Sequence, residues 1–277
     1  MSEKDNVLFV SAMTRKPVSC ASISADKPAF VYHQKLGRFH SDWHQHPWSQ
    51  FVYAENGFIH IHVADKKVLL PSWYGAWLPP NTLHEIWSDS PSLCIRAICF
   101  SVDAPISCLS HELAVFPVSP LLKEMIRYTE KWNERGQKDA QETTFLHALQ
   151  DLLPEEMTKS IKVCLPSTSH EKLAQLLAYL QKHLHEKLSI DFLAHEFGFS
   201  VRTLSRLFIQ QLGVSFSSYC KLARIMKALE LMETGNDNVS QIACAVGYES
   251  LATFSNNFLE ICGNRPLYFI NKRRGQR

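Results

Sequence analysis

The feature that most constrains this chain is a segment that it contains twice. Residues 190–219 read IDFLAHEFGFSVRTLSRLFIQQLGVSFSSY, and residues 239–269 read VSQIACAVGYESLATFSNNFLEICGNRPLYF. Both copies place an alanine four residues before a glycine, which is followed by an aromatic residue. With one extra residue in the second turn, the later apolar positions also match. Self-similarity of this kind indicates two copies of one structural unit.

Each copy predicts a short helix, a tight turn and a second helix. In the first copy, apolar residues recur at helical spacing up to Phe197, and Ser200 is placed to cap the next helix. Gly198 permits the positive φ that a tight exit requires. Ala194 is small where two helices must cross closely. This pattern is typical of a helix-turn-helix, whose second helix enters the major groove of double-stranded DNA.

The second helix of the first copy has an apolar face and a polar face. The apolar residues are Leu204, Leu207 and Phe208. The residues predicted to contact DNA bases lie opposite and are Arg202, Ser205 and Arg206. Arginine donates two parallel hydrogen bonds to guanine, which discriminates between bases by about 1–3 kcal/mol. Two arginines on a lone helix would more simply form a solvated face, but repetition of the whole unit favours DNA reading.

The second copy predicts a weaker reading helix. Its expected core residues are Leu251, Phe254, Phe258 and Ile261. Its expected DNA-facing residues are Ala252, Thr253, Asn256 and Asn257. Asparagine can read adenine and a threonine methyl can meet thymine, whereas the nearby Glu260 would repel phosphate. We therefore expect weaker or partly backbone contacts from this copy.

A helix over residues 215–233 is predicted between the copies. About 18 residues at 1.5 Å each span roughly 27 Å, which is close to one turn of DNA at about 34 Å. Such a helix would hold both units on one face of the duplex. Lys221, Arg224 and Lys227 on it are candidates for phosphate contact, and solubilising charge is the alternative.

Residues from about 170 to 274 resemble the DNA-binding domain of the AraC/XylS family of transcription regulators. The paired A-x-x-x-G-[FY] turns, the connecting helix, and VGYESLATFSNNF followed by GNRPLYF carry the resemblance. It implies a seven-helix domain whose two units occupy successive major-groove segments. Its base-reading positions fall on Arg202, Ser205 and Arg206, then on Ala252, Thr253 and Asn256. Many family members carry arginine or another long polar residue in place of Ala252 or Asn256, so the second unit is expected to read less sequence.

Composition and charge agree with a two-domain protein. The chain has 277 residues, of which 45% are hydrophobic and 20% charged, and no apolar run approaches membrane-spanning length. Residues 1–165 carry 16 basic and 18 acidic side chains, whereas residues 166–277 carry 13 and 9. The basic excess therefore lies on the repeat half, which suits a nucleic-acid surface. The N-terminus lacks the pattern of a signal peptide, and the eight cysteines include no C-x-x-C pair, so we expect a cytoplasmic protein.

The first half of the chain predicts antiparallel strands. From Phe30 to about Phe100, short apolar runs alternate with turn signals. These turns are expected at residues 55–57, 65–66 and 79–81. The expected fold class is therefore α+β with two domains: an N-terminal antiparallel β-barrel with helices, and a C-terminal all-α domain with two helix-turn-helix motifs.

His44 and His46 share one face of a strand, with Gln50 on the same parity and His84 in a later P-P-N-T-x-H segment. This H-x-H-x-x-x-Q pattern, followed by glycine and the second segment, resembles the two motifs of the cupin barrel, with Gln50 where metal cupins usually have Glu. In metal cupins these positions bind a divalent metal. The resemblance therefore makes His44, His46, Gln50 and His84 candidate ligands of an effector or a metal. Imidazole suits zinc, copper, iron or nickel. The alternative is a metal-free pocket whose histidines hydrogen-bond a ligand or one another.

Five of the six tryptophans lie in the barrel segment. The barrel segment contains Trp43, Trp48, Trp73, Trp77 and Trp87, which predict either core packing or a pocket for a flat or apolar small molecule. His60 and His62 alternate with apolar residues, so both are expected to face solvent.

Two amphipathic helices are expected after the strands, beginning at Ser119 and near Phe145. They would pack on the barrel or on a second subunit, and in relatives such helices often form a homodimer. IKVCLPSTSH then predicts the linker, with Thr168 and Glu171 as a capping box for the next helix. The expected domains are residues 1–165, which are cupin-like and regulatory, and residues 166–277, which bind DNA.

The favoured function is a non-enzymatic, DNA-binding transcription regulator that responds to a small-molecule effector. Double-stranded promoter DNA and the effector are its expected partners, with RNA polymerase a further one and no membrane partner. The rival is a metal-dependent cupin enzyme fused to a DNA-binding domain. Against the rival, the sequence shows no phosphate-cradling glycine loop, no nucleophile elbow and no H-E-x-x-H.

Overall fold

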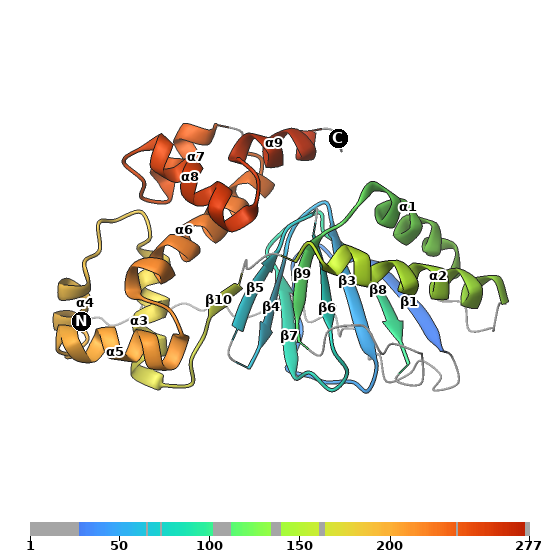
Figure 1. Cartoon of the computed structure of the whole chain (residues 1–277), viewed down its shortest axis with the longest axis horizontal. Coiled ribbons are helices and arrows are strands. Elements are labelled where there is room, and N and C mark those ends of the chain that lie inside the picture. The colour runs from blue at the N-terminus through green and yellow to red at the C-terminus, as the bar shows by residue number, and fades with distance from the viewer. Residues whose placement is uncertain are drawn as a thin grey trace, which may run out of the picture.

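The computed structural model describes residues 28–64, 66–72, 74–101, 112–133, 140–160, 164–236 and 238–274. A β-rich part formed by the first half of the chain lies beside a helical part formed by the second half (Figure 1). The predicted fold class, a barrel with helices followed by an all-α domain with two helix-turn-helix motifs, is confirmed. Trp73, one of the five tryptophans of the barrel segment, and Asp65, in a predicted turn, lie outside the described residues.

The β-rich part consists of two five-stranded antiparallel sheets, ordered β1-β8-β3-β6-β9 and β10-β5-β4-β7-β2. The strands are β1 (Ala29–Lys35), β2 (Phe39–His40), β3 (Ser49–Glu55), β4 (Ile59–Val63), β5 (Lys66–Leu70), β6 (Tyr74–Leu78), β7 (His84–Ser88), β8 (Cys94–Phe100), β9 (Ala114–Pro117) and β10 (Cys164–Pro166). Asn56 and Asn81 adopt positive φ angles of 59° and 56° in two of the turns predicted from the sequence.

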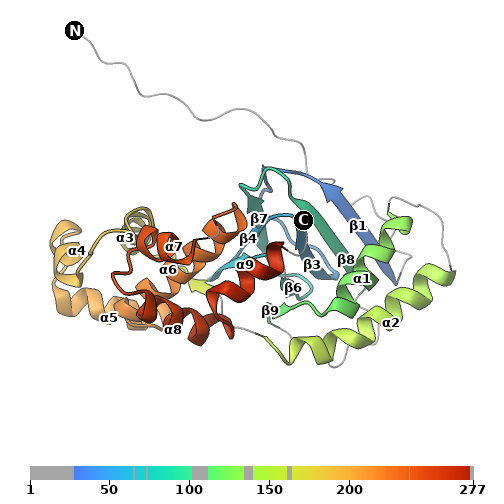
Figure 2. The same cartoon turned by 90° about the horizontal axis from the view of Figure 1, so that it is seen from above.

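Alternating side chains of each strand fill the space between the sheets. In β4, Ile59 and Ile61 are fully buried, whereas His60 and His62 point to the opposite face. The outer face of the first sheet is covered by α1 (Pro120–Tyr128), the 3-10 turn η2 (Thr129–Trp132) and α2 (Ala140–Met157), as Figure 2 shows. Their apolar residues share one cluster with Phe51 and Phe100 of the sheet. The two predicted helices thus pack on the barrel of their own chain.

The helical part contains α3 (Glu171–Lys182), α4 (Ile190–Glu196), α5 (Val201–Leu212), α6 (Phe216–Glu233), α7 (Val239–Ala245), α8 (Leu251–Cys262) and α9 (Pro266–Arg274). The two repeats fold alike. Ser200 and Ser250 cap α5 and α8, and Gly213 and Gly263 end these helices at positive φ angles of 69° and 72°. In the part of the chain that is described, no helix is long and apolar enough to cross a membrane.

Three local predictions were wrong. The expected linker contains β10, which pairs with β5 at the edge of the second sheet; Pro166 is tolerated there because an edge strand need not donate from every residue. The cap of α3 is His170, whose ring accepts from the backbone N–H of Leu173, while Thr168 accepts from His170 itself. Leu251, expected in the core, is 47% exposed because it occupies the first turn of α8.

The expected exposure of His60 and His62 was also wrong, although their parity was right. The outer face of β4 is covered by α6, and the ring of Trp43 lies 4.8 Å from that of His62. Both histidine side chains are therefore only 17% and 18% exposed. A sequence pattern distinguishes the two faces of a strand but does not show what covers the second face.

We expect Phe254→Ala to lower the free energy of unfolding by about 3–5 kcal/mol, because the ring is fully buried and its loss leaves a cavity. Leu251→Ala, three residues earlier, should cost below about 1 kcal/mol because that side chain is half exposed. Urea denaturation of the full chain measures both. Equal losses would show that the helical phase of α8 is misassigned.

Candidate functional site

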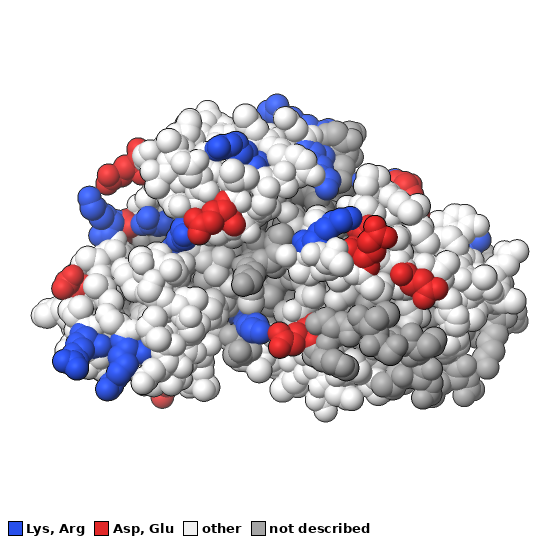
Figure 3. Space-filling view, in the orientation of Figure 1, with Lys and Arg blue, Asp and Glu red and all other residues white. Residues whose placement is uncertain are grey.

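The predicted reading face of α5 is open to solvent. Arg202, Ser205 and Arg206 are exposed, while Leu204 and Phe208 on the opposite face are fully buried. Neither arginine forms an ion pair with any residue that the structure describes, so both guanidinium groups remain available to an anionic partner. Figure 3 shows basic side chains gathered over this end of the helical part.

The second reading helix, α8, lies on the same side of the helical part as α5, with α3 and α7 on the other side (Figure 2). Ala252, Thr253 and Asn256 are exposed on it. Asn257 is half-buried, and its amide donates to the hydroxyl of Tyr248 at 3.1 Å, so this residue holds the turn between α7 and α8. The structure thus brings three of the four predicted residues to the surface.

Sequence reasoning missed Arg265, which follows the glycine exit of α8. Its Nη1 donates to Ser255 Oγ at 2.8 Å and lies 3.5 Å from Asn256 Oδ1. The guanidinium is therefore folded back along the reading helix and brings it a positive charge. The segment GNRPLYF predicts only the end of the repeat, and spacing along α8 does not place a residue that lies beyond the helix.

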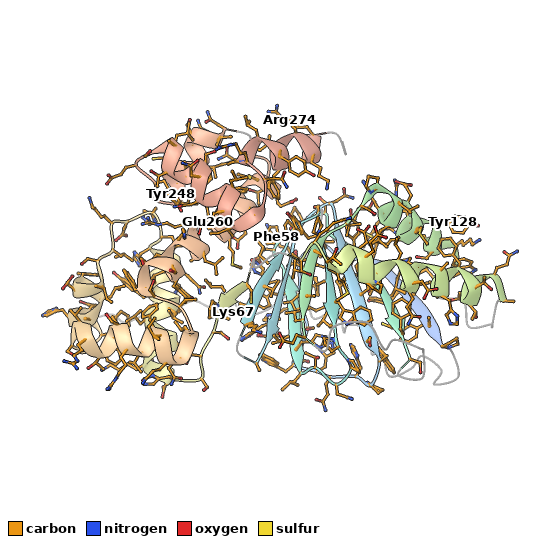
Figure 4. All side chains as sticks on the ribbon, viewed as in Figure 1. Phe58, Lys67, Tyr128, Tyr248, Glu260 and Arg274 are labelled. Carbon is orange, nitrogen blue, oxygen red and sulfur yellow. The ribbon has the colours of Figure 1, made fainter. Side chains whose placement is uncertain are left out.

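The basic residues of α6 are engaged within the helical part. Lys221 Nζ lies 2.8 Å from Glu260, a residue labelled in Figure 4, and Arg224 donates to the carbonyl oxygens of Leu184 and Glu186, each at 3.1 Å. Lys227 pairs with a glutamate one turn later on α6. Lys221 neutralises the carboxylate that was expected to repel phosphate.

Arg224 also fixes how the two units meet. A Cβ at Gly247, which has a φ of 84°, would lie 2.4 Å from the carbonyl oxygen of Leu184 and 3.0 Å from Arg224 Nη2. Glycine is therefore required where the second turn touches the loop before α4. A cleft of about 840 Å³ lies here between the units, and its lining includes Lys221 and Thr253.

In the barrel, three predicted residues converge. His44 and His84 exchange two backbone hydrogen bonds of 2.9 Å, which brings their rings to 4.3 Å between centroids. The ring centroids of His46 and His84 lie 5.2 Å apart. One nitrogen from each of the three rings lies within 4.8 Å of the others, and we call this group the histidine site.

Backbone carbonyls fix the tautomer of all three rings. The Nδ1–H of His44 donates to Asp42 O at 2.8 Å, that of His46 to Trp48 O at 2.8 Å, and that of His84 to Thr82 O at 2.7 Å. A carbonyl oxygen accepts only, so each neutral ring keeps its Nε2 lone pair. A metal-binding histidine is held in the same way, with its other nitrogen on a carbonyl or carboxylate.

The fourth predicted residue lies beside the histidine site. Gln50 Oε1 lies 3.1 Å from His46 Nε2. In this tautomer Nε2 of His46 carries a lone pair and no hydrogen. Without a metal, the Gln50 amide must therefore be flipped so that its N–H group donates to Nε2. His84 is fully buried and its Nε2 has no hydrogen-bond partner among the described residues. Burial lowers the pKa of His84 to about 4 and lowers the pKa of His46, so both rings are neutral at pH 7.

The residues present fit a divalent transition metal. Zinc–nitrogen bonds of 2.0–2.1 Å place tetrahedral ligands about 3.3 Å apart, and modest side-chain rotation from the observed 4.8 Å limit would reach that spacing. The unpartnered Nε2 of His84 is the observation that most favours an occupant, because a buried polar atom without a partner is costly. Indole Nε1 of Trp48, whose ring stacks on His46 at 5.3 Å, is also buried and finds no partner within the described part of the chain.

Comparison with known proteins accounts for both parts of the chain. Residues 28–154 match the model of the AraC-like ligand binding domain, and residues 193–272 match that of a helix-turn-helix domain. The HTH-type transcriptional regulator NimR of Escherichia coli K12 is 26% identical over 244 residues, which cover 87% of this chain and 86% of NimR. The HTH-type transcriptional activator RhaS of Escherichia coli O139:H28 is 36% identical over 90 residues, 32% of each chain.

Among solved structures, ToxT from Vibrio cholerae is similar with a TM-score of 0.38 and 15% identity, over 88% of this chain and 97% of ToxT. The two matched models follow one another in the order in which the structure presents a barrel and then two helix-turn-helix units. The chain therefore belongs to the AraC family of helix-turn-helix transcriptional regulators, with an AraC-like ligand-binding domain ahead of its DNA-binding domain.

Proposed function

We propose that this AraC-type regulator reads its operator mainly with α5 and that a ligand in the barrel controls it. The observation that supports this most is the pair of exposed arginines on α5, Arg202 and Arg206, which no described acidic residue neutralises. In this proposal residues 1–165 form the regulatory domain and residues 166–277 the DNA-binding domain. The protein acts in the cytoplasm without catalysing a reaction.

The two units contribute unequally. Arg202, Ser205 and Arg206 make base contacts in one major-groove segment, since arginine can bind guanine bidentately. Ala252, Thr253 and Asn256 meet the next segment with little hydrogen-bonding capacity, and Arg265 supplies the nearby charge for the DNA backbone. Lys221 adds a phosphate contact, whereas the two carbonyl bonds of Arg224 suit a structural role.

Further partners follow from the same assignment. A regulator bound beside a promoter meets RNA polymerase. A homodimer would place two such units on adjacent sites, and α1 offers an apolar surface for it, because Leu121 and Tyr128 are 60% and 53% exposed.

The ligand of the barrel is bound at its polar end. The interior beyond the histidine site is filled by apolar side chains such as Val52, Ile61 and Leu78, all fully buried. A divalent metal would be held by His44, His46 and His84, with Gln50 as the weaker fourth ligand. Such an ion would supply a positive charge and a Lewis-acidic centre at that end. A metal-dependent cupin enzyme joined to a DNA-binding domain is the second candidate function, favoured only by this cluster.

Salt-controlled binding of the purified chain across its own upstream DNA tests the main proposal. A specific site of about two major-groove segments per protomer supports it, with affinity that falls as salt rises because cations replace phosphate contacts. Binding that is equally weak on all sequences, together with turnover of a small molecule by the metal-loaded protein, would favour the enzyme instead.

Arg206→Ala should weaken binding to the specific site by about 1–3 kcal/mol and leave random DNA nearly unchanged, because the lost contact is to a base. Lys221→Ala, the matched control, should weaken both kinds of DNA alike and reduce the salt dependence by about one phosphate contact. Fluorescence anisotropy at several salt concentrations separates the two. Parallel losses for both variants on both DNAs would remove the base-reading role of Arg206.

Co²⁺ titrated into the full chain should give the visible bands of a tetrahedral ion, because one ring nitrogen from each of three histidines lies within 4.8 Å of the other two. His84→Ala should weaken Co²⁺ binding by at least about tenfold, since loss of an outer-shell partner alone costs that much. His62→Ala, on the outer face of the barrel, should bind Co²⁺ like the wild type. Absent bands, or equal loss in both variants, would leave the cluster as a metal-free pocket.

A further inference from the structure

Both reading helices expose one large apolar side chain in their third turn. Ile209 of α5 is 57% exposed and Leu259 of α8 is 38% exposed, and neither packs against the hydrophobic core of the described residues. They occupy equivalent positions of the repeat, each directly after a fully buried phenylalanine, Phe208 or Phe258. A single apolar side chain on a protein surface needs no explanation. Its recurrence at the same position of both units indicates a shared role.

Helical spacing places both side chains on the reading faces. Ile209 follows Arg206 by three residues and Arg202 by seven. Leu259 follows Asn256 by three residues in the same way. Residues at these separations lie on one side of a helix. Each apolar side chain therefore continues the row of exposed residues that the proposed function assigns to DNA bases.

The other exposed apolar residues of these two helices have a different cause. Val201 and Leu251 occupy the first helical position, and their exposed fractions are 38% and 47%. Val201 precedes Leu204 by three residues and Phe208 by seven, so it is in line with the buried face. Its exposure reflects the end of the helix, where no earlier turn covers it. The third-turn residues have no such cause, because both lie inside their helices and away from the buried stripe.

The charges beside these side chains favour DNA over a protein partner. Arg206 lies one turn before Ile209 and forms no ion pair with any described residue. Arg265 donates to Ser255 Oγ at 2.8 Å, one turn before Leu259. Each apolar side chain therefore has a guanidinium as its neighbour. This combination suits a ligand that presents apolar groups between anionic ones, as the major groove does between its two phosphate backbones.

The major groove offers one apolar group to such a side chain. Thymine alone among the four bases carries a methyl group, at C5, on its major-groove edge. The other bases present nitrogen and oxygen donors and acceptors there. An aliphatic side chain cannot pair with these groups, and it displaces the water that would. Apolar reading positions therefore fit thymine better than any other base.

We propose that Ile209 and Leu259 are specificity-determining residues, each of which contacts the C5 methyl group of a thymine. This inference rests on the proposed function, because it takes the exposed faces of α5 and α8 as the base-reading faces. Three helical residues rise about 4.5 Å, slightly more than one base-pair step of about 3.4 Å. The thymine that Ile209 contacts therefore lies one or two base pairs from the base that Arg206 reads. Through Leu259, the nearly neutral face of α8 also selects a base.

Removal of single methyl groups from the DNA tests the contact. A binding site is first selected from random duplexes with the purified full chain at fixed salt. Each thymine of that site is then replaced in turn by deoxyuridine, which pairs like thymine and lacks only the C5 methyl group. Replacement of a contacted thymine should weaken wild-type binding about fourfold in fluorescence anisotropy, the usual effect of one buried methyl group. Equal binding of every substituted duplex would overturn the proposal.

Double-mutant cycles assign each methyl group to a side chain. The segment read by α5 is the one in which Arg206→Ala loses discrimination. Ile209→Ala should abolish the deoxyuridine effect in that segment and retain it in the other, and Leu259→Ala should do the reverse. Leu251→Ala, which removes an exposed leucine of α8 in line with the buried face, should retain both effects. Deoxyuridine effects of the same size in all these variants would overturn the assignment.

Failure of this inference and failure of the proposed function give different results. If the wild type selects no sequence from the random pool, the proposed function falls and this inference falls with it. If it selects a site in which no methyl group matters, the proposed function stands and this inference falls. Ile209→Ala or Leu259→Ala could also reduce transcription by purified RNA polymerase at unchanged operator affinity. That result would make the polymerase the occupant and would equally overturn the inference.

Discussion

Burial of α6 on several sides at once is the constraint on which the rest of the molecule depends. Near its N-terminal end, Tyr219 is fully buried and packs edge-on against Phe208 of α5. Farther along, its buried residues include Ala223, Ile225, Met226, Ala228, Leu229 and Met232. A surface helix carries one apolar stripe, whereas these positions cover more than one face. The helix is therefore a shared core element, and the two reading units are held together through it.

Because the core of the helical part passes through α6, anything that fixes its position also fixes the reading helices. Arg224 ties its middle to the loop before α4, and Gly247 allows the second turn to approach the same loop. The carboxylates of Glu230 and Glu233 at its end meet the barrel. Contacts of α6 thus position the two helix-turn-helix units relative to each other and relative to the ligand-binding domain.

The repeat, the alternation of the strands and the cap residues could be predicted from the sequence, because each is a local pattern with a fixed period. Ser200 and Ser250 cap their helices as the spacing requires, and Ile59 and Ile61 face inward. A local pattern does not show which residues cover the second face of a strand. His60 has the outward parity expected of it, but the residue opposite it, Glu230, is 170 positions away in the chain.

The histidine site, too, could be predicted from the sequence only in part. His44, His46 and Gln50 could be grouped because side chains of equal parity share one face of an extended chain. Convergence with His84 depends on a backbone pair between two residues 40 positions apart, which no spacing rule predicts. The tautomers also require the structure, since they follow from three carbonyl oxygens that accept from Nδ1. The sequence thus identifies the candidate ligands, and tertiary pairing brings them together.

The two reading units differ in where their charge comes from, and this difference bears on how the protein selects DNA. In α5 the arginines stand on the reading face itself and are free of acidic partners among the described residues. In α8 that face is nearly neutral; Arg265 reaches it from beyond the helix, and Glu260 is held by Lys221. A face of this kind recognises groove shape and phosphates more than base edges. On the proposed function, the first unit specifies the site, and the second, supported by α6 and α9, sets the distance and orientation at which the duplex must continue.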